Sequence, residues 1–224
     1  MDIEQRVREK NRQLKDLIGL VKVDVSYAYE TERLLDEKIG FMAARCANVL
    51  DFGKSSRHRF DCFRPGQAET ADINRFEGYP EHVCDICDAS TFPAKRYGGI
   101  VCNAIIEHVY DPGAAVKNMF AALSDNGVCL CYAPFLYRYH APADLVYQDY
   151  FRFTRDGLAY LFRDFREVTL YPVRGRLSTA AKFGLPCLWK RVEKAVPAMN
   201  RILDRLGGFR DPLQTSGYVV WAVK

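Results

Sequence analysis

An apolar, strand-like run enters an Asp-x-Gly turn at residues 49–53 (VLDFG), and this feature most constrains the fold of the chain. In α/β sheets, ligands bind beyond the carboxyl ends of the strands, at turns that bring the backbone close to them. Gly53 permits such a turn because it has no Cβ atom. Two glycines that often follow at alternate positions are Ser55 and Arg57 here. The segment predicts a parallel sheet with a ligand site at this strand end.

Candidate strands and helices alternate along the rest of the chain. Strand-like runs occupy residues 47–52, 68–73, 97–103, 127–133, 167–172 and 216–223, and helical patterns occupy residues 1–22, 26–44, 112–123 and 156–162. Residues 127–133 show no polar alternation, as expected of a strand covered on both faces. The alternation predicts a doubly wound α/β fold with a mostly parallel sheet.

We expect one domain over residues 1–224, because the 224 residues are 49% hydrophobic and 27% charged. Within it we expect N-terminal helices at 1–44, a cofactor-binding core at 45–172, a basic helical segment at 173–212 and a final strand at 213–224. The first residues lack a secretory pattern and no long apolar run is present, so a cytoplasmic location is expected.

The cysteines do not predict disulfides or a metal site. Cys102, Cys129 and Cys131 fall inside apolar strand-like runs, where reduced thiols act as small core residues. Cys84 and Cys87 have the spacing of half a zinc site, but no second CxxC or HxxxH pair accompanies them. We therefore predict no bound metal.

The net charge of +4 is mild, but residues 174–210 are strongly basic. They contain nine basic residues, up to Arg210, against Glu193 and Asp204. Apolar side chains such as Phe183 and Trp189 are interspersed, which suits either an anionic membrane surface or a helical subunit interface, including a homodimer. The helix at 1–22 could likewise be a dimer contact, a membrane contact or a lid. No nucleic-acid motif accompanies the charge.

Polar residues end or follow successive strands, in an order that suits an adenosyl group. Asp72 ends the second strand, where a carboxylate can accept hydrogen bonds from both ribose hydroxyls. Asp88 follows in a loop where it could receive an adenine amino group, and Asn103 ends the next strand. Each could alternatively cap a loop. Their shared order with Gly53 favours an adenosyl-type pocket.

These segments resemble the motifs of class I S-adenosylmethionine-dependent methyltransferases of the broad group called type 11, from about residue 49 to residue 162. The matching segments are 49–53, 71–73 (ADI), 87–89 (CDA) with 92–93 (FP), 105–112 (IIEHVYDP) and 123–127 (LSDNG). The resemblance implies a seven-stranded sheet whose last strand is antiparallel, with S-adenosylmethionine as cofactor. The implied cofactor contacts are Asp51, Gly53, Ser55, Asp72, Ile73, Asp88, Ala89 and Asn103.

Two further segments, 134–141 (PFLYRYHA) and 149–154 (DYFRFT), look like a subgroup found in glycan, cell-envelope and secondary-metabolite biosynthesis. This resemblance implies O-methylation of a sugar or glycan-like acceptor, either a small molecule or a lipid-linked one. A hydroxyl acceptor must lose its proton, and His140 is the first candidate base because a neutral imidazole is available near pH 7. His108 is the second. Tyr139, Tyr150 and Arg152 are candidate acceptor contacts, or a lid anchor.

Two other classes of protein remain open at this stage. If Arg57 points into the pocket instead of outward, the chain could be an inactive methyltransferase-like binding module. A nicotinamide-dependent dehydrogenase also places an acidic residue at the second strand. The absence of glycine at position 55 and of a third glycine near position 58 counts against it.

Overall fold

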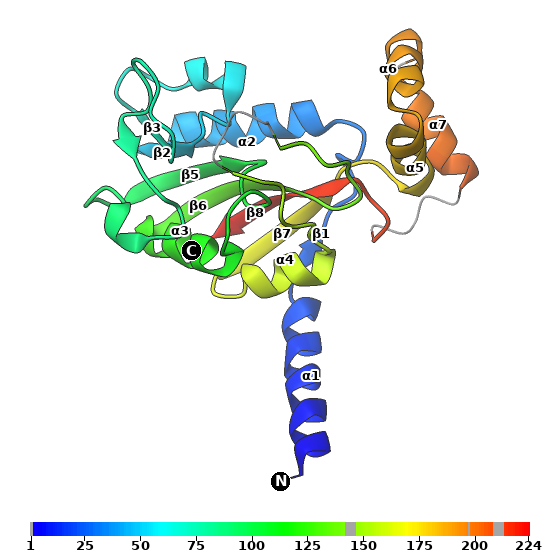
Figure 1. Ribbon diagram of the computed structural model, residues 1–224, viewed down its shortest axis with the longest axis horizontal. Coiled ribbons are helices and arrows are strands. Elements are labelled where there is room, and N and C mark those ends of the chain that lie inside the picture. Colours follow the sequence, from blue (N-terminus) through cyan, green and yellow to red (C-terminus); the bar gives the residue numbers. More distant parts are fainter. Residues whose placement is uncertain (1, 142–146, 197, 208–212) are drawn as a thin grey trace.

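The computed structural model describes residues 2–141, 147–196, 198–207 and 213–224. Within them, eight strands form one sheet in the order β1-β7-β8-β6-β5-β2-β3-β4 (Figure 1). The strands are β1 (Lys22–Val23), β2 (Val49–Phe52), β3 (Ala68–Asp72), β4 (His82–Val83), β5 (Tyr97–Asn103), β6 (Leu123–Pro134), β7 (Glu167–Pro172) and β8 (Gly217–Val223).

Only β8 runs against its neighbours, since it pairs antiparallel with both β6 and β7 while the other pairs in the described sheet are parallel. This confirms the predicted mostly parallel α/β fold with an antiparallel last strand. The sheet exceeds the expected seven strands because β1 adds an edge strand beside β7. Strands β1 and β4 have two residues each, too few for a sequence pattern to reveal.

Helices cover both faces of the sheet. They are α1 (Ile3–Gly19), α2 (Thr31–Arg45), α3 (Pro112–Ala122), α4 (Arg155–Leu161), α5 (Arg176–Gly184), α6 (Pro186–Ala195) and α7 (Met199–Leu206), with short 3-10 turns at Arg57–Cys62 and Ala89–Thr91. Figure 1 shows α2 on one face and α3 and α4 on the other. Met42 of α2 and Met119 of α3 are fully buried in the two resulting cores. Apolar burial on both sides therefore fixes the central strands.

The described part of the basic segment forms three helices, α5, α6 and α7, and Figure 1 shows them standing to one side of the sheet. A buried carboxylate holds two of them together. Asp204 of α7 accepts hydrogen bonds from the backbone N–H groups of Gly175 and Ser178 at the start of α5, at 2.9 Å each. Arg210 lies outside the described residues.

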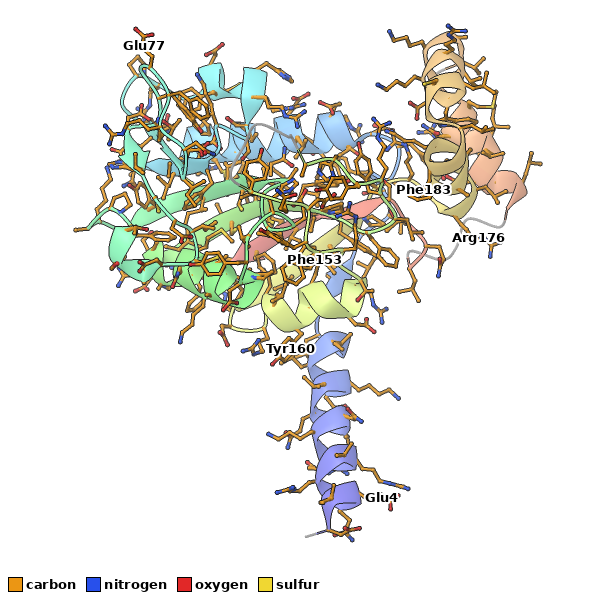
Figure 2. The ribbon with its side chains drawn as sticks, viewed as in Figure 1. Glu4, Glu77, Phe153, Tyr160, Arg176 and Phe183 are labelled. Carbon is orange, nitrogen blue, oxygen red and sulfur yellow. The ribbon has the colours of Figure 1, made fainter. Side chains whose placement is uncertain are left out.

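Helix α1 leaves the domain beside α4 (Figure 1), and Figure 2 shows Glu4 far from Tyr160 along its axis. None of its residues is buried, and Ile3 and Val7 are more than half exposed. No helix among the described residues has the length and apolar character that crossing a membrane requires.

Glu69 of β3 connects three strands near the edge of the sheet. Its carboxylate accepts hydrogen bonds from Tyr97 of β5 at 2.9 Å and from Lys95, and it lies 2.9 Å from a ring nitrogen of His82 in β4. Burial raises the pKa of Glu69, but the three partners outweigh this effect and lower it to about 2.

We predict that Glu69→Gln lowers the free energy of unfolding by about 2 kcal/mol at pH 7. Because the pKa is depressed in the folded state, this stabilisation is complete above the unfolded pKa of about 4.3 and is lost as the pH falls toward 2. Urea denaturation at several pH values measures it. A wild-type to variant difference that stayed constant between pH 5 and pH 3 would contradict the prediction.

Candidate active site

A cavity of about 230 Å³ opens at the carboxyl ends of β2, β3 and β5. Gly53, Asp72 and Ile73 line one side of it. The remaining wall combines apolar side chains with one further carboxylate, one histidine and three tyrosines, including Ile86, Ile105, Val109, Asp85, His108, Tyr110, Tyr147 and Tyr150. We call this space the cofactor cavity.

Gly53 is required at the turn that enters the cofactor cavity. Its φ angle is +64°, and an added Cβ atom would lie 2.8 Å from the Cδ1 atom of Ile105. A side chain at this position would therefore strain the backbone and collide with the cavity wall.

The buried carboxylate of Asp51 holds the rest of this turn. It accepts hydrogen bonds from the backbone N–H and the hydroxyl of both Ser55 and Ser56. Burial raises the pKa of Asp51 to about 6, against the opposing effect of these donors. Asp51 and Ser55 are thus turned toward the loop, and neither lines the cofactor cavity.

Ser55 also joins this turn to β5. Its hydroxyl oxygen accepts a hydrogen bond of 2.9 Å from the backbone N–H of Asn103, and the Asn103 amide donates to the Ser55 carbonyl at 3.2 Å. Asn103, predicted as a cofactor contact, therefore supports the loop and does not line the cofactor cavity. The serine replaces a glycine with a hydroxyl that the structure uses.

Arg57 does not enter the cofactor cavity. Its φ angle is +58°, its side chain is exposed, and it lines a second cavity described below. The arginine at this position therefore leaves the cofactor cavity open.

We predict that Ser55→Gly, although it introduces the glycine common at this position, lowers stability instead of improving function. Asn103 would lose an acceptor in a partly buried site and Asp51 would lose a donor, at a cost of about 1–3 kcal/mol. Chemical denaturation measures the change, with Ser90→Gly in an exposed turn as control. Unchanged stability in Ser55→Gly would show that the hydroxyl contributes nothing.

Asp72 is placed as the sequence predicts, at the end of β3 on the wall of the cofactor cavity. Its Oδ2 atom accepts a hydrogen bond of 2.9 Å from the hydroxyl of Tyr79, and its Oδ1 atom accepts one of 2.8 Å from the backbone of Asn74. Both partners orient the carboxylate. Ile73 follows on the same wall with half its surface exposed.

The structure does not bring Asp88 and Ala89 to the cofactor cavity. Asp88 is exposed and accepts hydrogen bonds from the backbone and hydroxyl of Ser90, so it caps a short turn. The acidic residue on the wall is Asp85, whose carboxylate accepts a hydrogen bond of 2.8 Å from Tyr110. Both carboxylates belong to one short segment, and only the turn decides which of them faces the cavity.

Three chemically active side chains meet beside the cofactor cavity: Glu107, His108 and His140. The Nε2 atoms of His140 and His108 lie 3.5 Å and 3.8 Å from one oxygen of Glu107. Glu107 is fully buried, and neither of its carboxylate oxygens has a hydrogen-bond partner in the described structure. The pKa of His140 is raised, chiefly by Glu107 and also by Asp149, while burial opposes this. We call these three residues the Glu-His-His cluster.

Asp149 and Arg152 support this cluster from behind. Asp149 lies 3.0 Å from the Nδ1 atom of His140 and forms a two-pronged ion pair with Arg152. Arg152 also donates to the carbonyls of Tyr137, Arg138 and Phe151, so all five of its N–H donors are used. Arg152 therefore positions the loop and has no donor left for an acceptor, contrary to the expectation from sequence.

The two predicted tyrosines lie in different places. Tyr139 is 64% exposed, donates to Gln148, and lines neither cavity. Tyr150 lines the cofactor cavity, on the cofactor side of the site.

A second cavity, of about 520 Å³, adjoins the first, and Ala104 lines both. His108 faces the cofactor cavity and His140 faces the second one, with their ring centres 4.8 Å apart. The second cavity also carries charged or titratable side chains from several elements, namely Glu30, Glu32, Arg57, His58, Arg59, Arg174 and Lys182. We call it the polar cavity. The Glu-His-His cluster thus lies where the two cavities meet.

Comparisons with known proteins identify the class. A family model described as a methyltransferase domain matches residues 27–165, more than half of the chain. An S-adenosylmethionine-dependent methyltransferase from Archaeoglobus fulgidus has a similar structure: 16% identity over 87% of this chain and 93% of that one, with a TM-score of 0.51. A 1,6-didemethyltoxoflavin-N1-methyltransferase from Burkholderia thailandensis has 15% identity over 87% and 78% of the chains, with a TM-score of 0.48. A search of curated protein sequences found no match.

The fold is that of the class I methyltransferases, and the chain belongs to the methyltransferase domain family. The dehydrogenase alternative has no support from these findings. S-adenosylmethionine is the cofactor indicated by this family, and the cavity fits it. A carboxylate at the end of β3 suits ribose hydroxyls, a glycine permits close backbone approach, and apolar side chains with Asp85 suit an adenine ring.

Proposed function

We propose that the protein is an S-adenosylmethionine-dependent O-methyltransferase whose acceptor is a sugar or glycan-like molecule. The observation that carries this proposal is the Glu-His-His cluster at the junction of the cofactor cavity and the polar cavity. An acceptor hydroxyl at that junction would face the cofactor on one side and proton-accepting groups on the other.

The residues of the cofactor cavity take distinct roles in this proposal. Asp72 accepts hydrogen bonds from the ribose hydroxyls and Asp85 receives the adenine amino group, while Ile73 and Ile86 cover the adenine faces. When bound, the cofactor supplies a methyl group on a positively charged sulfur, which is an excellent leaving group. The protein must then align the acceptor oxygen and exclude water.

The acceptor hydroxyl must lose its proton as its oxygen attacks the methyl carbon. His140 faces the polar cavity and is the first candidate to assist, and His108 is the second. Glu107 and Asp149 flank His140, so that a positive charge formed on its ring would be stabilised.

The charges of the polar cavity favour an acceptor with an anionic group. The Nε atom of Arg174 is buried without a hydrogen-bond partner in the described structure. Lys182 lies on the same cavity, and burial, together with Arg174, lowers its pKa. A guanidinium with a free donor beside a lysine suits a phosphate or carboxylate. A sugar phosphate or a lipid-linked glycan, in envelope or secondary metabolism, has these features.

We predict that Asp72→Asn weakens binding of S-adenosylhomocysteine by about 10-fold to 100-fold or more, because charge-assisted hydrogen bonds contribute roughly 1.5–3 kcal/mol each. Asp85→Asn should weaken it less, since its carboxylate is shared with Tyr110. Asp88→Asn, in the capping turn, is the matched control and should bind normally. Calorimetric titration measures all three. A loss confined to Asp88→Asn would overturn the assignment.

The same titration decides between an enzyme and an inactive binding module. Micromolar binding justifies a screen of sugar phosphates and lipid-linked glycans for methylated product by mass spectrometry, with Asp72→Asn as the negative control. No binding at millimolar S-adenosylhomocysteine, with or without acceptor, would favour the inactive module and contradict the proposed function.

We also propose that the basic segment contacts an anionic membrane surface on the cytoplasmic side, which would bring the site to a lipid-linked acceptor. Phe183, Leu185 and Leu188 are each more than half exposed. Lys190, Arg191 and Lys194 are exposed on the same short stretch of helix. Figure 2 shows Phe183 and Arg176 on the helices that stand away from the sheet. Apolar side chains among cations are typical of interfacial helices.

We predict that replacing Lys190, Arg191 and Lys194 together by Gln weakens binding to vesicles containing anionic lipid by at least tenfold, since each cation near such a surface contributes about 1 kcal/mol. Vesicle co-sedimentation measures this, with Lys10→Gln, Arg12→Gln and Lys15→Gln on α1 as the matched triple control. A change of oligomeric state in light scattering, without loss of vesicle binding, would indicate a homodimer interface instead.

A further inference from the structure

We infer that Glu107, His108 and His140 bind a divalent metal ion of the first transition row at the junction of the two cavities. The three side chains offer one carboxylate oxygen and two imidazole nitrogens within 4.8 Å of one another. Two histidines and one carboxylate form a recurring ligand set for such ions and leave coordination positions open for other ligands. This corrects the expectation of no bound metal, which rested on the Cys84–Cys87 spacing.

The carboxylate of Glu107 has no partner of its own among the described residues. Glu107 is fully buried, and neither oxygen accepts a hydrogen bond from any described residue. The nearest charged or titratable nitrogens are the Nε2 atoms of His140 and His108, at 3.5 Å and 3.8 Å. A buried carboxylate is normally paired or coordinates a metal, because loss of hydration is costly.

The imidazole rings of His108 and His140 are both turned toward Glu107. The Nδ1 atom of His108 lies 2.9 Å from the Gln148 carbonyl oxygen, which can only accept a hydrogen bond. The Nδ1 atom of His140 lies 3.0 Å from Asp149 and 3.2 Å from the Arg138 carbonyl. These acceptors hold the Nδ1 side of each ring, so both Nε2 atoms face Glu107. A cation satisfies three such groups at once.

The Nδ1 atoms of both histidines contact groups that fix the rings. Metal-binding histidines usually donate their second ring nitrogen to a carboxylate or a backbone carbonyl, which fixes the ring. Here Asp149 and the Gln148 carbonyl take those roles. Asp149 is itself held by Arg152, whose donors are all used. Arg152 thereby fixes Asp149, and Asp149 fixes the ring of His140 toward Glu107.

The position of this site gives the ion a catalytic use, and this part rests on the proposed O-methyltransferase function. An acceptor hydroxyl that coordinated the ion would have a lowered pKa and release its proton to solvent, so that His140 would act as a metal ligand in place of a general base. Its oxygen would then form a bond to the methyl carbon while the carbon–sulfur bond breaks and its electron pair stays on sulfur. A neighbouring hydroxyl could fill a second position, so the acceptor class is a vicinal diol such as a sugar.

The test is calorimetric titration of Mn²⁺ into the metal-free full-length protein, together with the absorption spectrum of the Co²⁺ complex. We expect one ion per chain. Glu107→Gln and His140→Gln should each weaken Mn²⁺ binding by at least 100-fold, whereas His82→Gln, which lies on the sheet edge away from both cavities, should bind normally. The metal-free Glu107→Gln protein should be at least as stable as wild type, because an unpaired buried charge is removed.

Two results would overturn the inference. One is the absence of stoichiometric Mn²⁺ or Co²⁺ binding in the wild type. The other is metal binding by folded His140→Gln that is as tight as in the wild type. This second variant keeps the test decisive even if Glu107→Gln fails to fold. A metal-free Glu107→Gln protein that is less stable than metal-free wild type would also count against the inference. It would show that the carboxylate pairs with protonated histidines. Stoichiometric binding without methylation of any diol would support the metal site and contradict the proposed function instead.

Discussion

The buried carboxylate of Asp51 is the interaction on which the site depends. It satisfies four donors from Ser55 and Ser56, and so fixes the turn that follows β2. Ser55 passes this constraint to β5 through Asn103. The ends of β2 and β5 are thereby held at one height, with the turn at Gly53 open toward Asp72. Without this network, the turn at Gly53 that lines the cofactor cavity would not be fixed. Burial of apolar side chains on both faces of the sheet supplies the stability that the network only directs.

A second buried carboxylate at the same edge of the sheet behaves in the opposite way. Asp51 has a donor for each of its hydrogen-bonding needs, whereas Glu107 has none among the described residues. Both are inaccessible to water, so the difference cannot be made up by hydration. A fully satisfied buried group is a structural element. An unsatisfied one between two histidines, at the junction of two cavities, is what a binding site for a cation requires. The contrast separates a carboxylate that maintains the fold from one that has no partner among the described residues.

The sequence was sufficient for the fold and for part of the site, and the reasons are local. Alternating apolar runs revealed the long strands, and the Asp-x-Gly turn with Asp72 located the cofactor cavity. The remaining features of the fold and the site need tertiary information. The edge strands β1 and β4 are too short to show a period. Asp85 and Asp88 share one segment, and only its turn sends Asp85 to the cavity. Arg152 was predicted to contact the acceptor, because the sequence spacing does not show that Asp149 and three carbonyls already use all its N–H donors. Glu107 and His140 are separated in the sequence by α3 and β6, and their approach depends on how β5 and β6 end side by side.

The segment from Tyr147 to Arg152 couples the two halves of the site. Tyr147 and Tyr150 line the cofactor cavity, while Gln148 and Asp149 hold the rings of His108 and His140. The backbone N–H groups of Tyr150 and Phe151 donate to the carbonyl of Glu107, and Arg152 ties the segment to residues 137 and 138. A shift of this segment would therefore disturb the cofactor wall and both histidines together. The two cavities cannot be shaped independently in such an arrangement, because one short stretch of chain orients side chains that face each of them. This geometry gives a direct physical route by which occupation of one cavity can organise the other.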